Sequence, residues 1–367
     1  MQATNHVVSA QWASRPNDQR FLDVASLGRK VRARRQSSEV LDVALDCMQV
    51  RPMTESADAD IELVDSRGQH YGQLTHYSFG QLCQRAHAPA GFLRELPPML
   101  ACMNLQYKLE AAERRANDEG NDAKILTRRN GSLDIAAVNS GTYGRIWDAD
   151  VVGAVETYVD LDEWRVPSSS YSGTDPLRVT TLYASDRDIF LFLVNETAEV
   201  SASGESLKRG FYVWNSEVGS ATFGVAMMLY DRVCDNRIIW GVRDFREVKI
   251  RHTSGGPMRF VQTATPQLEA YVRSSPALVE GTIRRAKDKV LGKSQADVLS
   301  WMKQRGFTQP QARAAYEAAE NDPRGYNPRS VWGLVQGLTE SAHELKHTDE
   351  RVALERKAGA LLDLVSE

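Results

Sequence analysis

The sequence AKILTRRNGSLDIAAV (residues 123–138) contains two segments with apolar residues, joined by Asn130-Gly131. A type I′ turn needs a positive φ at both central residues, and Asn-Gly is a pair that meets this need. The segments on either side, 123–129 and 132–138, are the strands that such a turn would join. This stretch therefore predicts an antiparallel β-hairpin.

The residues on both sides of this hairpin predict helices as well as strands. Residues 61–74 predict another hairpin, which turns at Ser66-Arg67-Gly68. Periodic apolar residues predict helices at 78–87, 99–117 and 147–159. This part of the chain is therefore expected to be mixed α+β.

The C-terminal half changes from strands to helices. Residues 178–252 are strand-rich, and Val248 and Ile250 alternate there with charged neighbours. After Pro257 the pattern is helical, with short Gly, Pro and Asn breaks. We therefore expect an α+β fold with a mostly antiparallel, hairpin-rich sheet, packed helices and a helical C-terminal bundle. The expected divisions are a basic flexible arm at 1–37, an α+β core at 38–256 and a helical C-terminal region at 257–367.

The composition is that of an ordinary globular protein. The chain has 45 Lys and Arg against 48 Asp and Glu, so any surface for nucleic acid must come from local clustering of cations. Its longest apolar runs are far shorter than the ~20 residues that span a bilayer, and its N-terminus lacks the apolar core of a signal peptide. Four cysteines without a CxxC pair do not predict a zinc or disulfide framework. We expect a cytoplasmic protein that does not enter a membrane.

One short motif raises the possibility of catalysis. The segment HELKH (residues 343–347) matches HExxH, in which two histidines bind Zn²⁺ and the glutamate is the general base. Lys346 would place a cation beside the metal, and the sequence offers no recognisable third ligand. A solvated helix end is therefore the favoured interpretation, and a zinc metallopeptidase is the less favoured one. The sequence has no GxxxxGK[ST], GxGxxG or GxSxG motif, so we expect no enzymatic activity, cofactor or metal.

Basic residues gather in three parts of the sequence. Five of the seven residues at 29–35 are basic, Arg128-Arg129 lie beside the predicted turn, and several cations lie at 243–252 with aromatic neighbours such as Tyr212 and Trp214. A sheet face with cations and aromatic rings suits single strands, because phosphates are neutralised while bases stack. An ordinary charged sheet face with core aromatics is the alternative. The candidate nucleic-acid-binding residues are Arg32, Arg34, Arg35, Arg128, Arg129, Arg243, Arg246, Lys249, Arg251 and His252.

Two short sequence motifs resemble those of a known family. The segment VKIRHTSG (248–255), preceded by FGVAMMLYDRVCDN (223–236), resembles a phage- and plasmid-like family classed as a domain of unknown function. The segment NPRSVWG (327–333) resembles a later phrase of that family. Where members usually have Cys-Thr-Asn-Gly, this chain has Cys-Asp-Asn-Arg at 234–237. The resemblance covers roughly residues 41–362 and implies a mobile genetic element, but no established activity.

These observations lead to one main prediction of function. We predict a non-enzymatic protein that binds single-stranded DNA, an annealing or recombination-accessory protein of a mobile genetic element that forms homo-oligomers. The prediction requires that folding gather the separated cations into one groove. The alternative is a protein-interaction or structural module of a phage or plasmid, either counter-defence or virion-associated.

Overall fold

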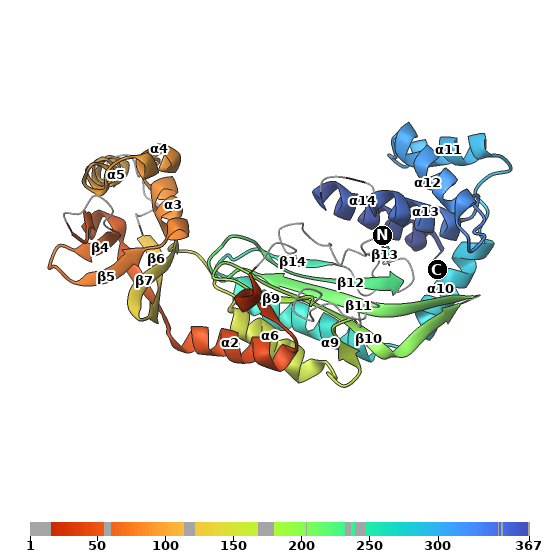
Figure 1. The fold of residues 1–367 in the computed structure, drawn as a ribbon, viewed down its shortest axis with the longest axis horizontal. Coiled ribbons are helices and arrows are strands. Elements are labelled where there is room, and N and C mark those ends of the chain that lie inside the picture. Colours follow the sequence, from red (N-terminus) through yellow and green to blue (C-terminus); the bar gives the residue numbers. More distant parts are fainter. Residues whose placement is uncertain are drawn as a thin grey trace.

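The computed structural model describes residues 16–54, 60–113, 122–167, 180–202, 204–231, 236–238, 247–343, 345 and 348–365. Figure 1 shows three parts in a row: a small sheet with its helices at one end, a large sheet in the middle, and a group of C-terminal helices at the other end. Helix α2 (Val24–Gln36) lies between the two sheets. The expected α+β class is confirmed.

The small sheet has six strands in the order β2-β6-β7-β5-β4-β3. Helices α3 and α5 pack on it, and α4 contacts both of them. Leu82, Leu105 and Ile135 are among the fully buried residues of its core. The bounds are β2 Ser38–Ala44, η2 Leu45–Cys47, β3 Met48–Pro52, β4 Ile61–Asp65, β5 His70–Leu74, α3 His76–Arg85, α4 Ala90–Glu95, α5 Pro98–Glu113, β6 Asp122–Asn130 and β7 Ser132–Ser140.

The hairpin predicted at 123–138 is confirmed as β6 and β7, but its turn differs from the prediction. Gly131 has a φ of 84°, whereas Asn130 is not among the described residues with positive φ. Asn130 pairs instead with Ser132 as the last rung of the ladder, and the register shifts between Leu126 and Thr127. Only glycine was needed for the left-handed position. The hairpin at 61–74 is also confirmed, as β4 and β5, with Gly68 at a φ of 83°.

The large sheet has eight strands and lies in the middle of the molecule. Its main path runs β1-β9-β10-β11-β12-β13, while β14 pairs with β12 and β8 with β10. Neighbouring strands of this sheet pair antiparallel among the described residues, as expected for a hairpin-rich sheet. The bounds are β1 Arg20–Phe21, β8 Trp164–Arg165, β9 Leu182–Ala184, β10 Ile189–Ala202, β11 Glu205–Asn215, β12 Phe223–Asp231, β13 Asn236–Ile238 and β14 Val248–Ile250.

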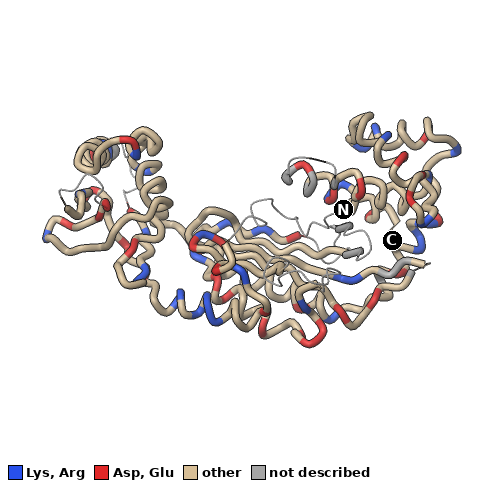
Figure 2. The backbone as a smooth tube through the Cα atoms, in the orientation of Figure 1, with Lys and Arg blue, Asp and Glu red and all other residues tan. Residues whose placement is uncertain are grey.

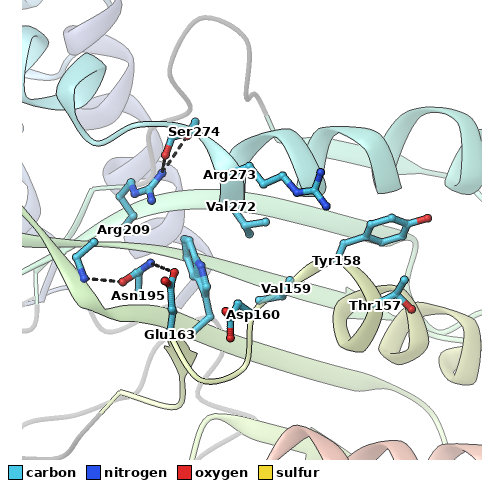
Figure 3. Close-up of a pocket in the computed structure, with 12 residues that line it drawn as sticks. Thr157, Tyr158, Val159, Asp160, Glu163, Asn195, Arg209, Val272, Arg273 and Ser274 are labelled. Atoms are coloured by element: carbon cyan, nitrogen blue, oxygen red, sulfur yellow. Dashed lines mark hydrogen bonds between the residues drawn. The ribbon is translucent and has the colours of Figure 1, made fainter.

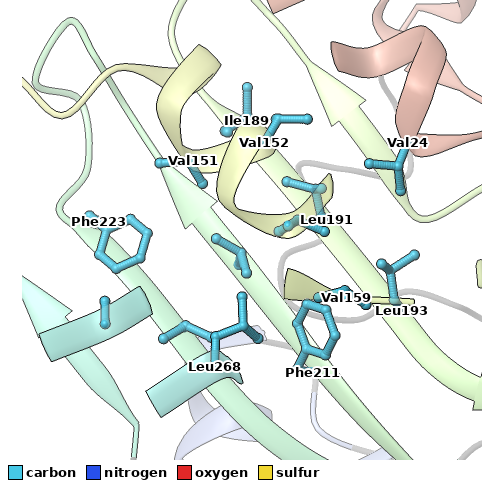
Figure 4. Packing of buried hydrophobic residues seen from close by; sticks show 14 of the residues in the cluster. Val24, Val151, Val152, Val159, Ile189, Leu191, Leu193, Phe211, Phe223 and Leu268 are labelled. Atoms are coloured by element: carbon cyan, nitrogen blue, oxygen red, sulfur yellow. The ribbon is translucent and has the colours of Figure 1, made fainter. Parts of the chain in front are cut away.

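One face of the large sheet is covered by three helices that come from distant parts of the chain. Helices α2, α6 (Asp148–Tyr158) and α9 (Thr265–Arg273) place Val24, Val152 and Leu268 against strand residues such as Leu191 and Phe211 (Figure 4). Burying a side chain of this size stabilises the fold by about 1.5–3 kcal/mol. This core holds α2 and α6 side by side at the junction between the two sheets.

Helix α2 replaces part of the arm that we expected to be flexible. Val24, Leu27 and Val31 are buried, and their spacing of three and four residues is that of one helical face. Asp23 caps the helix by accepting a hydrogen bond from the backbone N–H of Ser26 at 2.6 Å. Basic residues lie between these apolar ones, so an argument from charge alone did not predict this apolar helical face. Residues 1–15 of the expected arm lie outside the described residues.

The C-terminal region is helical, as expected, and packs around its own core. Trp332, Leu334 and Leu338 of this core are buried, together with Leu207 and Leu229 from the ends of β11 and β12. The helical stretch expected after Pro257 begins with α8, η3 and α9 in succession, and Pro266, which has no N–H to donate, follows the π turn η3. The bounds are α8 Gly256–Arg259, η3 Phe260–Ala264, α10 Ala277–Asp288, α11 Gln295–Lys303, α12 Gln309–Asn321, α13 Val331–His343, α14 Thr348–Ala360 and η4 Leu361–Val365; η1, Asn17–Gln19, lies at the other end of the chain.

Among the helices of the described residues, none has the length and apolar character needed to cross a membrane. Of the HELKH segment, Glu344, Lys346 and His347 lie outside the described residues, so the proposed zinc ligands are not placed.

Candidate functional site

Two of the predicted nucleic-acid-binding arginines lie inside the protein. Arg34, in the last turn of α2, donates to the carboxyl of Asp148 at 2.5 Å and forms an ion pair with Glu217 at 3.1 Å, and its side chain is only 9% exposed. Arg128, on β6, forms an ion pair with Glu217 at 2.5 Å and donates to the carbonyl oxygen of Asp186 at 3.0 Å. Both guanidinium groups are therefore unavailable to a phosphate on the surface.

A third arginine, which the sequence did not single out, completes this cluster. Arg145, in the segment between β7 and α6, donates to Oδ1 of Asn139 at 2.9 Å and to the backbone carbonyl of Glu217. Asp148 accepts a hydrogen bond from Nδ2 of Asn215 at 2.7 Å. We call Arg34, Arg128, Arg145, Asp148 and Glu217 the junction network, because α2, the small sheet, α6 and the large sheet meet there.

The surroundings of the junction network shift the pKa values of its two carboxyl groups in opposite directions. Complete burial, together with the nearby charge of Glu217, raises the pKa of Asp148 to about 8. Burial also acts to raise the pKa of Glu217, but the charges of Arg34 and Arg128 outweigh it, so this pKa is lowered from 4.5. When two carboxyl groups lie close together in a protein interior, one keeps its proton while the other ionises, because two negative charges at short distance repel each other. The network is thus an internal link between sheets that carries ionisable groups.

His252, another candidate nucleic-acid-binding residue, also packs against other residues of the protein. Its ring stacks on Tyr143 with centroids 5.1 Å apart, and its Nδ1 accepts from the backbone N–H of Ile146 at 3.4 Å. The N–H of Gly144 donates to the His252 carbonyl at 3.0 Å. Burial lowers the pKa of His252 to about 4, so the ring is neutral at pH 7. His252 therefore brings no positive charge to a phosphate.

The other candidate cations lie on the surface, in different settings. Arg32 forms an ion pair with Glu156 at 2.5 Å, and Lys249 forms one with Glu247 at 3.3 Å. The Arg35 guanidinium lies 3.7 Å from the centroid of the Trp147 ring. Within the described part of the chain, exposed Arg129 and Arg251 make no side-chain hydrogen bond or ion pair. Arg243 and Arg246 lie outside the described residues.

These placements do not form the continuous groove that the sequence argument required. Figure 2 shows stretches of Lys and Arg interspersed with Asp and Glu over all three parts of the described backbone. Folding does bring Arg34 and Arg128 together, but around a buried carboxylate. The sequence shows which residues are cationic. It does not show whether folding gathers them in a groove on the surface or around a buried carboxylate, because both arrangements need clustered arginines.

The structure does place aromatic rings and cations together on one row of the large sheet. Directly paired residues of antiparallel strands point to the same face, so the pairings define a row across six strands. The members of this cross-strand row are Arg20, Tyr183, Phe190, Trp214, Gly224 and Lys249. A cation stands at each end, and three aromatic residues lie between. The row is on the face opposite the core of α2, α6 and α9, because its aromatic residues belong to a separate cluster.

Trp214 is the most accessible ring of this row. It is half-buried, whereas Tyr183 and Phe190 are 4% and 6% exposed. A Cβ on Gly224 would lie 1.9 Å from Cζ2 of the indole, so only glycine leaves room for Trp214 on this face. Tyr212 stacks on Trp214 with ring centroids 5.5 Å apart. Packing thus holds the indole flat against the sheet, beside the strand that carries Lys249.

A polar pocket of about 600 Å³ lies on the other side of the large sheet (Figure 3). Arg209, at its inner wall, donates to the backbone carbonyls of Tyr271 and Ser274 at 3.3 and 2.6 Å. These are carbonyls at the C-terminal end of α9, where a cation is favourable. Carboxylates of Asp160 and Glu163 also line the pocket. Arg209 is therefore engaged in capping a helix, and the carboxylates of Asp160 and Glu163 balance the charges of Arg209 and Arg273 in the lining.

Comparison with known proteins places this chain in a family. The family model described as a domain of unknown function, DUF932, matches residues 174–359, just over half of the chain. The chain belongs to the DUF932 family. The expected membership of an uncharacterised family is thereby confirmed, and neither a curated protein nor a solved structure matches the chain.

The DUF932 match covers the large sheet from β9 onward and most of the C-terminal helices, including Glu217 and His252. Arg34, Arg128 and Asp148 precede the match, so the junction network joins the DUF932 region to the N-terminal part of the chain. The segment 248–255, which carried the resemblance, packs there too, since Thr253 forms a β-bridge with Tyr143.

Proposed function

We propose that this DUF932 protein binds single-stranded nucleic acid on the face of the large sheet that carries the cross-strand row, as a non-enzymatic accessory protein of a mobile genetic element. The observation that supports the proposal is the row itself, in which Trp214 and Lys249 lie on one face, separated by Gly224. A base stacks on an aromatic ring without regard to its identity, while a neighbouring cation neutralises phosphate.

The proposed contacts differ from those that the sequence suggested. Trp214 offers a ring for one base, and Lys249 and Arg251 offer charges for the adjoining phosphates. The Lys249 side chain is 50% exposed and its partner Glu247, at 3.3 Å, also pairs with Arg356 at 2.5 Å. Since an exposed ion pair contributes about 0–1 kcal/mol, we expect a phosphate to be able to replace Glu247 beside Lys249. Arg34 and Arg128 belong instead to the junction network, and their part is to hold the two sheets together.

The proposal is tested by fluorescence anisotropy of a labelled oligo(dT) across a series of salt concentrations. Affinity should fall as salt rises, and each phosphate contact that is removed should lower the slope of log K against log salt by about 0.7. Lys249→Glu with Arg251→Glu should therefore weaken binding and flatten the slope, and Trp214→Leu should weaken binding with the slope unchanged.

Lys303→Glu is the matched control, because Lys303 is an exposed cation on α11 in the C-terminal helices. It should bind as the unaltered protein does. Binding that is absent, or that the Lys249 and Arg251 changes leave untouched, contradicts the proposal. In that case the protein-interaction module predicted as the alternative is the better hypothesis.

A further inference from the structure

Helix α5 carries an apolar stripe on its outer side. Met99, Met103 and Tyr107 follow one another at intervals of four residues and are 52%, 61% and 64% exposed. Leu100, on the same helix, and Phe92, on α4, are also about half exposed. In Figure 1 these helices belong to the small-sheet part of the molecule, at the opposite end from the C-terminal helices. We call these five residues the α5 stripe.

The opposite side of α5 already provides the contacts that the fold needs. Cys102, Leu105 and Leu109 are 2% exposed or less and belong to the core of the small sheet. Gln106 accepts a hydrogen bond from the backbone N–H of Val50 at 2.9 Å, which fixes α5 along the edge strand β3. A contiguous apolar patch on the exposed side of a helix is a common mark of an interaction surface. The α5 stripe therefore points to a further partner.

We infer that α5 packs antiparallel against α5 of a second copy of this chain, about a two-fold axis at Met103. The spacing of the stripe is symmetric about this residue, so an antiparallel partner places its own Tyr107 against Met99, and its own Met99 against Tyr107. Residues at i, i+4 and i+8 form a ridge that can pack against an identical ridge. A two-fold axis brings the same patch of both copies together, which requires such self-complementarity.

The charges at the ends of the stripe fit this arrangement. Glu110 is exposed and lies seven residues after Met103, two turns along the same face of α5. An antiparallel pair keeps the Glu110 carboxylates of the two copies at opposite ends of the interface. A parallel pair would instead bring Glu110 of both copies together, which like charges disfavour.

The area of the stripe also fits a second copy. Five half-exposed side chains of this size present on the order of 500 Å² of apolar surface, at the upper end of what monomers leave uncovered. With a polar rim of residues such as Asn104, the face comes close to the ~800 Å² that each partner contributes to a stable interface. The inference is independent of the proposed nucleic-acid surface, because α5 belongs to the small sheet and the cross-strand row to the large one.

The first test is sedimentation equilibrium of the full chain from about 1 to 100 µM. The unaltered protein should approach twice its monomer mass as concentration rises. Met103→Glu puts two carboxylates opposite each other at the axis and should weaken the dimer at least about tenfold. Met258→Glu, on α8, changes a methionine of similar exposure, 64% against 61%, and should leave the dimer intact. A monomer at all concentrations, or equal effects of the two changes, overturns the inference.

Cysteine cross-linking tests the geometry. In a chain with Cys47→Ser and Cys234→Ser, Met103→Cys lies beside its own copy at the axis and should give a disulfide-linked dimer on mild oxidation. Met99→Cys alone should stay uncross-linked, whereas Met99→Cys together with Tyr107→Cys should cross-link, because these two positions face each other across the axis. Cross-linking of Met99→Cys alone would show a parallel pair and overturn the antiparallel arrangement.

Discussion

Nη2 of Arg128 on the small sheet lies 2.5 Å from Oε1 of Glu217 at the end of the large sheet, and the two side chains are only 5% and 2% exposed. Arg34 reaches the same carboxylate from α2. One buried carboxylate thus joins three structural elements. Its removal should affect stability far more than the removal of an ion pair on the surface.

Glu217→Gln keeps the shape of the side chain but leaves Arg34 and Arg128 without this counter-charge. We expect a loss of about 3–5 kcal/mol in the free energy of unfolding, measured by urea denaturation. Glu156→Gln is the control, since Glu156 pairs with Arg32 on the surface and its loss should cost about 1 kcal/mol or less. Similar losses in the two variants would show that the junction network does not stabilise the fold.

Stability should also fall as pH rises through the neutral range. The folded protein holds the pKa of Asp148 at about 8, mainly by burial, whereas an unfolded chain has it near 3.8. Between these values the folded state binds a proton that the unfolded chain has released, so raising the pH favours unfolding. Asp148→Asn should make the urea midpoint less dependent on pH between about pH 6.5 and pH 8, above the range in which unfolding changes the charge of His252. If the urea midpoint of this variant depended on pH as that of the unaltered protein does, groups other than Asp148 would be the cause.

The glycine beneath Trp214 should tolerate no side chain. Gly224→Ala puts a Cβ 1.9 Å from the indole, so the ring must move and the melting temperature should fall. Gly153, inside α6, has nothing within 4 Å of a Cβ, and Gly153→Ala should raise stability by about 0.5–1 kcal/mol through helix propensity. Thermal unfolding of both variants tests the prediction, and a stable Gly224→Ala protein would mean that the indole can leave the row.

The described cysteines should differ in their reaction with a thiol reagent. Burial raises the pKa of Cys83 to about 11 and that of Cys102 to about 12, and a thiol reacts as its thiolate. Cys47 is exposed. A Cys234→Ser protein should therefore release one equivalent of colour quickly with a disulfide reagent, and the other two only in urea. Rapid release of all three would show that the core of the small sheet opens readily.

Local features of the fold could be predicted because their causes are local. Gly131 and Gly68 supply the positive φ that a turn needs, whatever lies around them, and the apolar spacing after Pro257 indicates helices without knowledge of their partners. The helix at 24–36 was missed although its apolar residues were regularly spaced, because its many cations suggested a solvated arm. In such a basic segment it is the spacing of the apolar residues, and not the charge, that decides whether a helix packs on the core.

The sequence by itself determined the two hairpins, the helical character of the C-terminal region and the membership of a family, since each depends on neighbouring residues or on short motifs. Only the tertiary structure decided what the arginines do. Arg32 and Arg34 lie two residues apart in one basic run, yet one is on the surface and the other is buried against Asp148, 114 residues away. The charge of a side chain is fixed by its chemistry, but its partner is chosen by packing between segments that the sequence keeps far apart.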